Sequence, residues 1–170
     1  MNLKSIITET ANWPTAGVNF LDITPILENP SVFDWCIDQL VVGAKTATSI
    51  VAVESRGFPI GAVVANRLSI PLVLVRKPGK LPGAVYSESY ATEYSTDAVE
   101  IKQSANVGTH PMIIDDLLAT GGTVGAVVAL LKKNFNPIQV SCGVLINLSF
   151  LPGQQLLRDL QIDLISLETY

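Results

Sequence analysis

Charged residues are scarce in this sequence, and those present show no excess of positive charge. Asp, Glu, Lys and Arg make up 15% of the 170 residues, and the formal net charge is −4 at pH 7. A protein that binds nucleic acid typically carries a basic patch or stripe. Since none emerges here, we expect no nucleic-acid partner. The 48% share of apolar residues also argues against an intrinsically disordered chain.

Cysteine and histidine are rarer still, and long apolar runs are absent. Cys36 and Cys142 lack the spacing of a metal site and lie in apolar surroundings, so we expect two buried thiols in a reducing compartment. His110, the only histidine, precedes Pro111 in a turn and is expected to be structural. No apolar run is long enough to span a bilayer and no signal peptide is evident, so we expect a cytoplasmic protein without a membrane partner.

The length and the apolar pattern predict one α/β domain over residues 1–170, with no internal repeat. A buried strand is expected over residues 49–53 and a further strand over residues 71–75, with a helix over residues 59–68 between them. A strand, a helix and a strand in this order imply a right-handed parallel crossover. Further predicted elements are a helix that begins at Asn29 and Pro30, and strands over residues 138–148 and 162–167.

Near the N-terminus, the pattern predicts a helix and then a loop. Leu3, Ile6 and Ile7 lie on one face of a helix that should stop before Trp13. Residues 14–25 mix turn formers with an aromatic residue and an aspartate, a composition too irregular for a regular core element.

The central stretch of the chain runs from residue 111 to residue 123. A short buried strand over residues 112–114 is followed by two adjacent carboxylates, a loop of small residues and a helix over residues 124–131. Backbone N–H groups of such a loop can close around an anion, and the helix N-terminus favours phosphate. The loop is not a Walker A site, because no Gly-Lys-Ser/Thr follows at the required spacing.

The two carboxylates, Asp115 and Asp116, are unusual directly before a phosphate site. They repel each other and would repel the phosphate. They make sense as acceptors for two vicinal hydroxyls, so a sugar phosphate could place its phosphate in the loop and its diol on this pair. A capping aspartate beside an ordinary solvated aspartate is the equally open alternative from the residues alone.

The sequence Ile-Ile-Asp-Asp-Leu-Leu-Ala-Thr-Gly-Gly-Thr resembles the phosphoribosyl pyrophosphate (PRPP) motif of type I phosphoribosyltransferases, and is closest to those acting on adenine. The resemblance implies a type I phosphoribosyltransferase fold: a mainly parallel twisted sheet flanked by helices, with an N-terminal hood and a flexible flap. It implies a homodimer that transfers the phosphoribosyl group from PRPP to adenine, giving AMP and pyrophosphate, with Mg²⁺ held mainly by substrate oxygens. The PRPP-binding residues implied in this motif are Asp115, Asp116, Ala119, Thr120, Gly121, Gly122 and Thr123.

The hood of that family resembles residues 17–25. Its aromatic residue stacks on the purine, and Phe20 holds that position, with Asn19 and Leu117 as further base-binding residues implied by the resemblance. Many relatives carry a basic residue where this chain has Leu21. From composition alone, Phe20 could equally plug the core.

The pyrophosphate loop of the family resembles the sequence Glu-Ser-Arg-Gly-Phe, which follows the strand over residues 49–53. The resemblance makes Arg56 an anion-binding residue. Ligands in open α/β sheets bind beyond the carboxyl ends of the strands, so Arg56 is expected at the same edge as Asp115. An ion pair of Arg56 with Glu54 is the alternative.

Residues 76–83 are basic, rich in Pro and Gly, and without periodicity, which predicts a mobile loop. Its positive charge suits a polyanionic ligand, and a solvated linker is the alternative. We therefore expect Arg76, Lys77 and Lys80 to contact PRPP.

A hairpin is predicted next, with strands over residues 86–95 and 98–102 and a turn at Thr96 and Asp97. It resembles the flap of the family and contains the Glu-Tyr pair of that element. The resemblance makes Glu93 the catalytic acid or base and Tyr94 a PRPP-binding residue.

Glu93 is assigned to proton transfer because a ring nitrogen of adenine must gain or lose a proton as the glycosidic bond forms. The 6-oxopurine enzymes use an aspartate in the phosphate loop for this step, where this chain has Ala119. Glu88 and Asp22 are the other titratable candidates. Without the resemblance, Glu93 would be an exposed residue on a hairpin strand.

Two other functions compete with the adenine reaction. Xanthine phosphoribosyltransferases of the adenine-like type are the nearer alternative. A regulator that binds PRPP without turnover is the other, but it would need a DNA-binding module for which neither the length nor the charge leaves room.

Overall fold

A parallel sheet forms the centre of the computed structural model, which describes residues 1–13, 15–91 and 96–170. The strands lie in the order β10-β9-β7-β3-β4, and the short β8 also pairs with β9. Every pairing in this sheet is parallel, which confirms the predicted crossover and the α/β class. The strands are β3 (Ser49–Val53), β4 (Leu72–Val75), β7 (Pro111–Ile114), β8 (Leu117–Leu118), β9 (Ser141–Asn147) and β10 (Asp163–Thr169).

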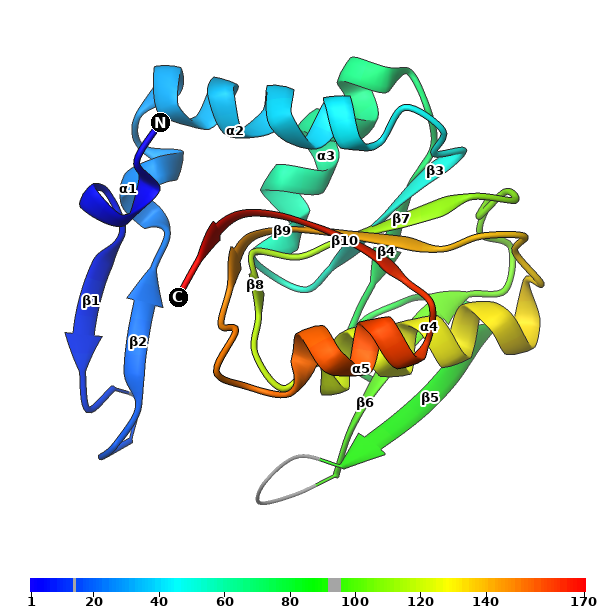
Figure 1. Ribbon diagram of the computed structural model, residues 1–170. Coiled ribbons are helices and arrows are strands. Elements are labelled where there is room, and N and C mark those ends of the chain that lie inside the picture. Colours follow the sequence, from blue (N-terminus) through cyan, green and yellow to red (C-terminus); the bar gives the residue numbers. More distant parts are fainter. Residues whose placement is uncertain (14, 92–95) are drawn as a thin grey trace.

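Helices cover both faces of this sheet, as Figure 1 shows. Helices α2 (Pro30–Gly43) and α3 (Gly57–Leu68) lie on one face, while α4 (Gly122–Asn134) and α5 (Gly153–Asp159) lie on the other. All five residues of β3 are buried, as expected for a strand covered on both faces. The side chain of Asn29 accepts a hydrogen bond from the N–H of Val32, which confirms the predicted start of α2.

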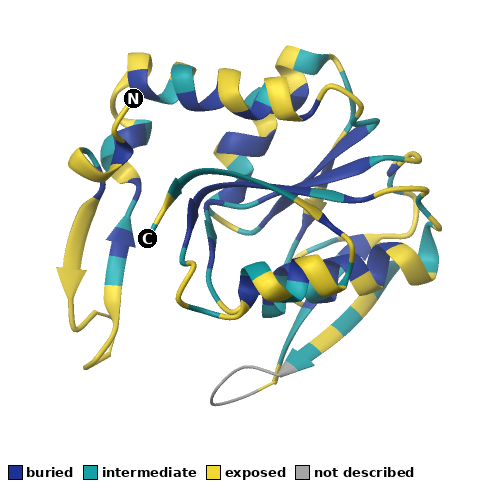
Figure 2. Ribbon diagram, in the orientation of Figure 1, coloured by how far each residue is buried: buried dark blue, intermediate teal, exposed yellow. Residues whose placement is uncertain are grey.

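The N-terminal segment differs from the sequence prediction. Instead of a helix and a loop, it forms a single 3₁₀ turn over Leu3–Ser5, the antiparallel strands β1 (Thr8–Ala11) and β2 (Asn19–Asp22), and a short helix α1 (Thr24–Leu27). Leu3 and Ile7 are buried, so one turn already buries most of the stripe on which the helix prediction rested. Figure 2 shows that much of this hairpin is exposed, and Leu21 of β2 is its buried contact with the core.

A second hairpin, at the position of the predicted flap, projects beside α4. It consists of β5 (Val85–Ala91) and β6 (Thr96–Lys102), which pair antiparallel. The predicted turn at Thr96 and Asp97 is wrong, because these residues pair with Ala91 and Tyr90 as the first residues of β6. None of the helices in the described part of the chain has the length and hydropathy that crossing a bilayer requires.

Candidate active site

The carboxyl ends of the parallel strands bring the predicted site residues together. Asp115 and Asp116 follow β7, and Arg56 follows β3 at the neighbouring position, immediately before α3. A side chain at Gly57 would collide with the backbone of Ile114 and Asp115, so glycine is what lets α3 start this close to β7. His110 lies before β7, at the opposite end of that strand from the carboxylates, and Thr109 Oγ1 contacts its Nδ1 at 2.9 Å.

The aspartate pair is withdrawn from solvent. Only 7% of the Asp116 side chain is exposed, and its Oδ2 lies 2.9 Å from Arg56 Nη2. That oxygen nevertheless accepts no hydrogen bond of good geometry from the described residues. Asp115 Oδ1 accepts the N–H of Asp116 at 2.9 Å. A buried acceptor with such incomplete hydrogen bonding is one that a ligand hydroxyl would satisfy, whereas a solvated aspartate does not match this burial.

Burial also sets the electrostatics of the pair. It raises the pKa of Asp115 well above its usual value, and the adjacent Asp116 carboxylate raises it further. Burial raises the pKa of Asp116 as well, while the charge of Arg56 partly offsets that effect. Both carboxylates are therefore costly to hold ionised in the free protein, which a purely structural role would not require.

The loop of small residues forms a shallow cavity at the N-terminus of α4. It has a volume of about 90 Å³ and is lined by Asp115 and by residues 117–124. Gly121 has φ of +83°, in the left-handed region that favours glycine, and a side chain there would press on Gly153 and Leu156. The N–H groups of the first turn of a helix lack partners within that helix, so the start of α4 beside this cavity suits an anion.

A larger cavity, with a volume of about 640 Å³, lies between the sheet edge and the β1–β2 hairpin with its connecting loop, which corresponds to the predicted hood. The predicted base-binding residues Asn19, Phe20 and Leu117 line it, and Arg56 Cζ lies 5.0 Å from the centre of the Phe20 ring. The side chain of Asn19 donates to Glu9 Oε2 across the hood hairpin at 2.9 Å. Leu148, Phe150 and Leu151 also line this cavity and were not predicted from the sequence. Phe150 is 73% exposed just beyond β9, and an aromatic residue before Pro-Gly at a strand's carboxyl end was the available signal.

Arg76, rather than Arg56, pairs with Glu54. The Glu54 carboxylate accepts hydrogen bonds from Arg76 Nε at 3.2 Å, from Arg76 Nη2 at 3.1 Å and from the N–H of Lys77 at 2.9 Å. The hydrogen bonds from Arg76 and Lys77 hold the pKa of Glu54 below its usual value. The carbonyl of Lys80 accepts from Arg76 Nη1 at 3.1 Å, so the irregular segment predicted here is tied back to the sheet edge.

A third cavity, of about 220 Å³, lies between this basic segment and the aspartates. Arg76, Lys77 and Asp115 line it together with Thr123 of the loop, and two residues of the flap, Tyr90 and Asp97, close it from the other side. Lys77 Nζ lies 3.3 Å from Asp97 Oδ2. Arg76 and Lys77, two of the three predicted cations of this segment, therefore border a space that also reaches Asp115.

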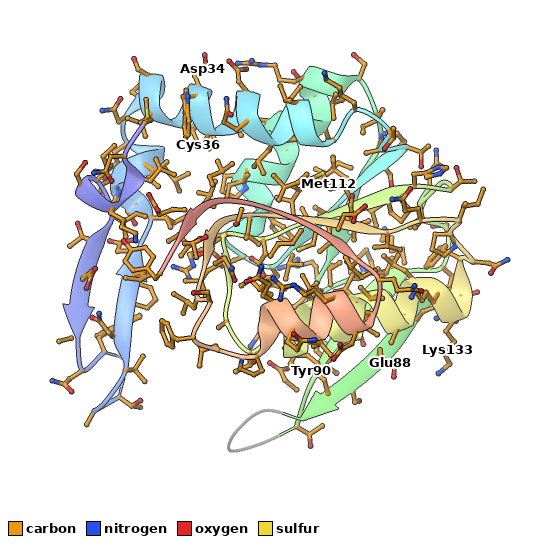
Figure 3. The ribbon with its side chains drawn as sticks, in the orientation of Figure 1. Asp34, Cys36, Glu88, Tyr90, Met112 and Lys133 are labelled. Atoms are coloured by element: carbon orange, nitrogen blue, oxygen red, sulfur yellow. The ribbon has the colours of Figure 1, made fainter. Side chains whose placement is uncertain are left out.

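The predicted catalytic residue Glu93 and its neighbour Tyr94 lie outside the described residues. The two other proton-transfer candidates are already engaged. Glu88 Oε2 lies 3.5 Å from Lys133 Nζ on α4, a pair labelled in Figure 3. Asp22 accepts hydrogen bonds from the hydroxyl and the N–H of Thr24, which lower its pKa.

Both cysteines are free and buried, as predicted. Burial raises the pKa of Cys36 to about 11, and it also raises the pKa of Cys142. The thiols are therefore protonated at neutral pH and take no part in the site.

Most of the chain is similar to known proteins. Residues 32–164 match the family described as the phosphoribosyl transferase domain. An adenine phosphoribosyltransferase of Acaryochloris marina is 42% identical over 166 residues, which cover 96% of this chain and 97% of the relative. This chain belongs to the adenine phosphoribosyltransferase family. The family resemblance predicted from residues 113–123 is thereby confirmed.

Solved structures of adenine phosphoribosyltransferases share the fold. The enzyme of Thermoanaerobacter pseudethanolicus has a TM-score of 0.90 and 38% identity, with 99% of this chain and 98% of that chain covered. The Saccharomyces cerevisiae enzyme, solved with an imino-altritol bisphosphate and adenine, has a TM-score of 0.89 and 32% identity, with 97% and 96% covered. The predicted type I fold is confirmed.

Leu21 occupies the hood position at which the family resemblance implies a basic residue in many relatives. Its side chain is only 5% exposed, and its carbonyl accepts a hydrogen bond from Arg56 Nη1 at 3.4 Å. This position therefore offers the site a backbone carbonyl and an apolar side chain rather than a second charge.

Proposed function

We propose that this protein transfers the phosphoribosyl group of PRPP to adenine, giving AMP and pyrophosphate in purine salvage. The observation that carries the proposal is the buried Asp116 carboxylate, whose Oδ2 contacts Arg56 but accepts no hydrogen bond of good geometry from the described residues. Its neighbours Asp115 and Leu117 line the phosphate-sized cavity, and Leu117 also lines the hood cavity. A sugar phosphate with a purine at its reactive carbon spans these three features. The 42% identical relative carries the same activity in its name.

In this proposal, each group of site residues binds a different part of the substrates. Thr120, Gly121, Gly122 and Thr123 hold the 5′-phosphate, and Asp115 and Asp116 accept hydrogen bonds from the ribose diol. Phe20 stacks on adenine, while Arg76, Lys77 and Lys80 bind the pyrophosphate. Fixed positive charge near a departing pyrophosphate stabilises the transition state most when water is excluded. Arg56 lies between the diol site and the hood, so it must exchange its contact with Asp116 for the ligand.

Mg²⁺ fits this donor set as an ion shared with the substrate. The described residues contain no cluster of three or more His, Cys, Asp or Glu side chains that could cage a metal ion. Asp115 and Asp116 offer carboxylate oxygens near the ribose and pyrophosphate positions, and Mg²⁺ commonly takes one or two carboxylates together with substrate oxygens and water. When bound, the ion would neutralise pyrophosphate charge.

The base is assigned to adenine from Ala119 and the apolar hood. Incubation with PRPP, Mg²⁺ and each of adenine, hypoxanthine, guanine and xanthine is expected to give rapid product formation with adenine alone. Measurement of nucleotide and pyrophosphate by chromatography checks this result. Preferential use of xanthine or hypoxanthine would reverse the assignment, and tight PRPP binding without turnover of any base would favour a regulator.

A homodimer is part of the proposal, with β4 at its centre. β4 is the edge strand of the sheet, and it exposes Leu72 at 39% and Leu74 at 37%. Next to them lies a cavity of about 430 Å³, lined also by Leu81 and Pro82. An exposed aliphatic edge strand is a surface that natural proteins usually cover, and a second copy of this chain would do so.

Sedimentation equilibrium is expected to give about twice the 18.2 kDa mass of the chain. Leu74→Glu places a charge on the proposed interface and should shift the protein towards the monomer. Ile138→Glu is the control, because Ile138 is 77% exposed and lies away from β4 in the sequence and the sheet. A Leu74→Glu variant with the wild-type mass would exclude this edge as the interface.

Because both cysteines are free, we place the protein in the cytoplasm, which is a reducing compartment.

A further inference from the structure

The first strand of the flap lies along α4 through three side chains on one face. The Tyr86 ring packs edge-on against Phe135 at 5.5 Å, and Glu88 pairs with Lys133 at 3.5 Å. The Tyr90 hydroxyl lies 3.0 Å from Thr123 Oγ1. Alternate residues of a strand share a face, so β5 runs from the end of α4 back to its start. Tyr90 and Glu88 are seen beside α4 in Figure 3.

Thr123 lies in the first turn of α4 and lines the phosphate cavity, so its hydroxyl can bond to both Tyr90 and a phosphate. A hydroxyl carries one proton and two lone pairs. If Thr123 donates its proton to Tyr90, it has none for a phosphate. If Tyr90 donates to Thr123, the Thr123 proton is free to point into the cavity. A phenol is more acidic than an alcohol, which favours Tyr90 as the donor.

Asp97 is the competing acceptor for the Tyr90 proton, because the two residues are cross-strand neighbours. Its Oδ1 accepts the N–H of Ala98 at 2.8 Å, and its Oδ2 lies 3.3 Å from Lys77 Nζ. The Ala98 N–H and then Lys77 hold the pKa of Asp97 below its usual value, with a smaller contribution from Tyr90. Each oxygen of Asp97 has a further lone pair, but the hydrogen bond that the Tyr90 hydroxyl makes at good geometry among the described residues is the one to Thr123 at 3.0 Å. The geometry therefore makes the Thr123 oxygen the better-placed acceptor.

We propose that Tyr90 is a positioning residue for the phosphate site: its hydroxyl donates to Thr123 and so aims the Thr123 proton at the 5′-phosphate. The inference rests on the proposed function, since it takes the loop as the site of that phosphate. A chain of two hydrogen bonds then runs from Tyr90 through Thr123 to the ligand, and each bond polarises the next. The flap thereby contributes to substrate binding through a residue that does not itself touch the substrate.

The test compares two tyrosine variants that lose only a hydroxyl. Tyr90→Phe is expected to weaken binding of ribose 5-phosphate, measured by titration calorimetry, by about two- to tenfold, the range of a neutral hydrogen bond. The KM for PRPP should rise by a similar factor, while the KM for adenine stays near the wild-type value. Tyr86→Phe is the matched control, because Tyr86 lies on the same face of β5 at the far end of α4 and should bind ribose 5-phosphate as the wild type does.

A double-mutant cycle separates positioning from a general loss of structure. Thr123→Val removes the intermediate hydroxyl, and Tyr90→Phe added to it should then cost no further affinity. Additive losses, wild-type affinity in Tyr90→Phe, or an equal loss in Tyr86→Phe would each overturn the inference. Tighter binding in Tyr90→Phe would overturn it too, since it would mean that Thr123 donates to Tyr90.

The outcomes also distinguish this inference from the proposed function. Wild-type protein that binds ribose 5-phosphate but turns over no base would refute the function and leave the role of Tyr90 intact. Wild-type protein that does not bind ribose 5-phosphate would overturn both.

Discussion

Asp115→Asn is expected to weaken PRPP binding by about ten- to a hundredfold, because a hydrogen bond to a charged group contributes roughly 1.5–3 kcal/mol. The amide keeps the shape of the side chain and can still accept the N–H of Asp116, which now lies at 2.9 Å. What it loses is the negative charge that a ribose hydroxyl would meet. Calorimetric titration with PRPP and Mg²⁺ measures the effect.

The same substitution is expected to stabilise the free protein. The pKa of Asp115 is raised in the folded state, chiefly by burial and then by Asp116. At a pH below the unfolded-state pKa, this carboxyl is protonated in both states and its ionisation does not affect stability. As pH rises through the window between the unfolded and the raised folded value, the folded state binds more protons than the unfolded state, so stability falls. At pH 7 the burial of this acid therefore costs free energy that the burial of an amide does not.

A higher melting temperature is therefore expected for Asp115→Asn at pH 7, measured by thermal denaturation. The gain should disappear at low pH, where Asp115 is protonated in both states. Asp38→Asn is the control, because 55% of the Asp38 side chain is exposed and its ion pair with Arg67 lies on the surface. A lower melting temperature for Asp115→Asn, or equal PRPP affinity, would show that the pair is structural.

Asp116→Asn should weaken PRPP binding similarly but stabilise the fold less. Its carboxylate lies 2.9 Å from Arg56, so the substitution also removes a favourable charge contact. This difference between two adjacent aspartates depends on which of them the guanidinium reaches, and no sequence pattern states that.

The sequence predicted the sheet and its ligand-binding edge because their signals are local. The buried run at β3 and the strand–carboxylate–glycine order at β7 fix which residues lie at the carboxyl ends of the strands. Because Asp115 and Asp116 directly follow the buried strand β7, they are withdrawn from solvent as well. The hood hairpin was not predicted, since the spacing of Leu3 and Ile7 fits a helix and nothing local reveals that Thr8 pairs with Asp22.

Contacts between distant residues were the other part that the sequence could not provide. Glu54 was considered as a partner of Arg56, two positions away, whereas it pairs with Arg76 from the next strand end. The contact of Tyr90 with Thr123 joins residues 33 positions apart through two hydroxyls that carry no charge pattern. Phe150 lines the hood cavity only because the segment after β9 meets the hood in space.

Glu93→Gln is expected to lower kcat by about 10²–10⁴-fold, the usual contribution of general acid–base catalysis. Adenine must exchange a proton at a ring nitrogen during the reaction, and Ala119 cannot supply it from the phosphate loop. Glutamine retains the size and hydrogen-bonding groups of glutamate but does not titrate near neutral pH. PRPP affinity should change little, since in the proposal it depends on Asp115, Asp116 and the basic side chains. Steady-state kinetics and PRPP titration together measure both parts.

Glu88→Gln is the matched control for this prediction. Glu88 lies in β5, and its carboxylate faces α4, where Oε2 lies 3.5 Å from Lys133 Nζ. Its substitution should therefore leave kcat near the wild-type value. If Glu93→Gln lowers kcat less than about fivefold, the loss is too small for a proton carrier. Asp22 would be tested next, although the hydrogen bonds from Thr24 lower its pKa and make it a weak base. A large loss in Glu88→Gln instead would move the proton-transfer role to the residue that faces α4.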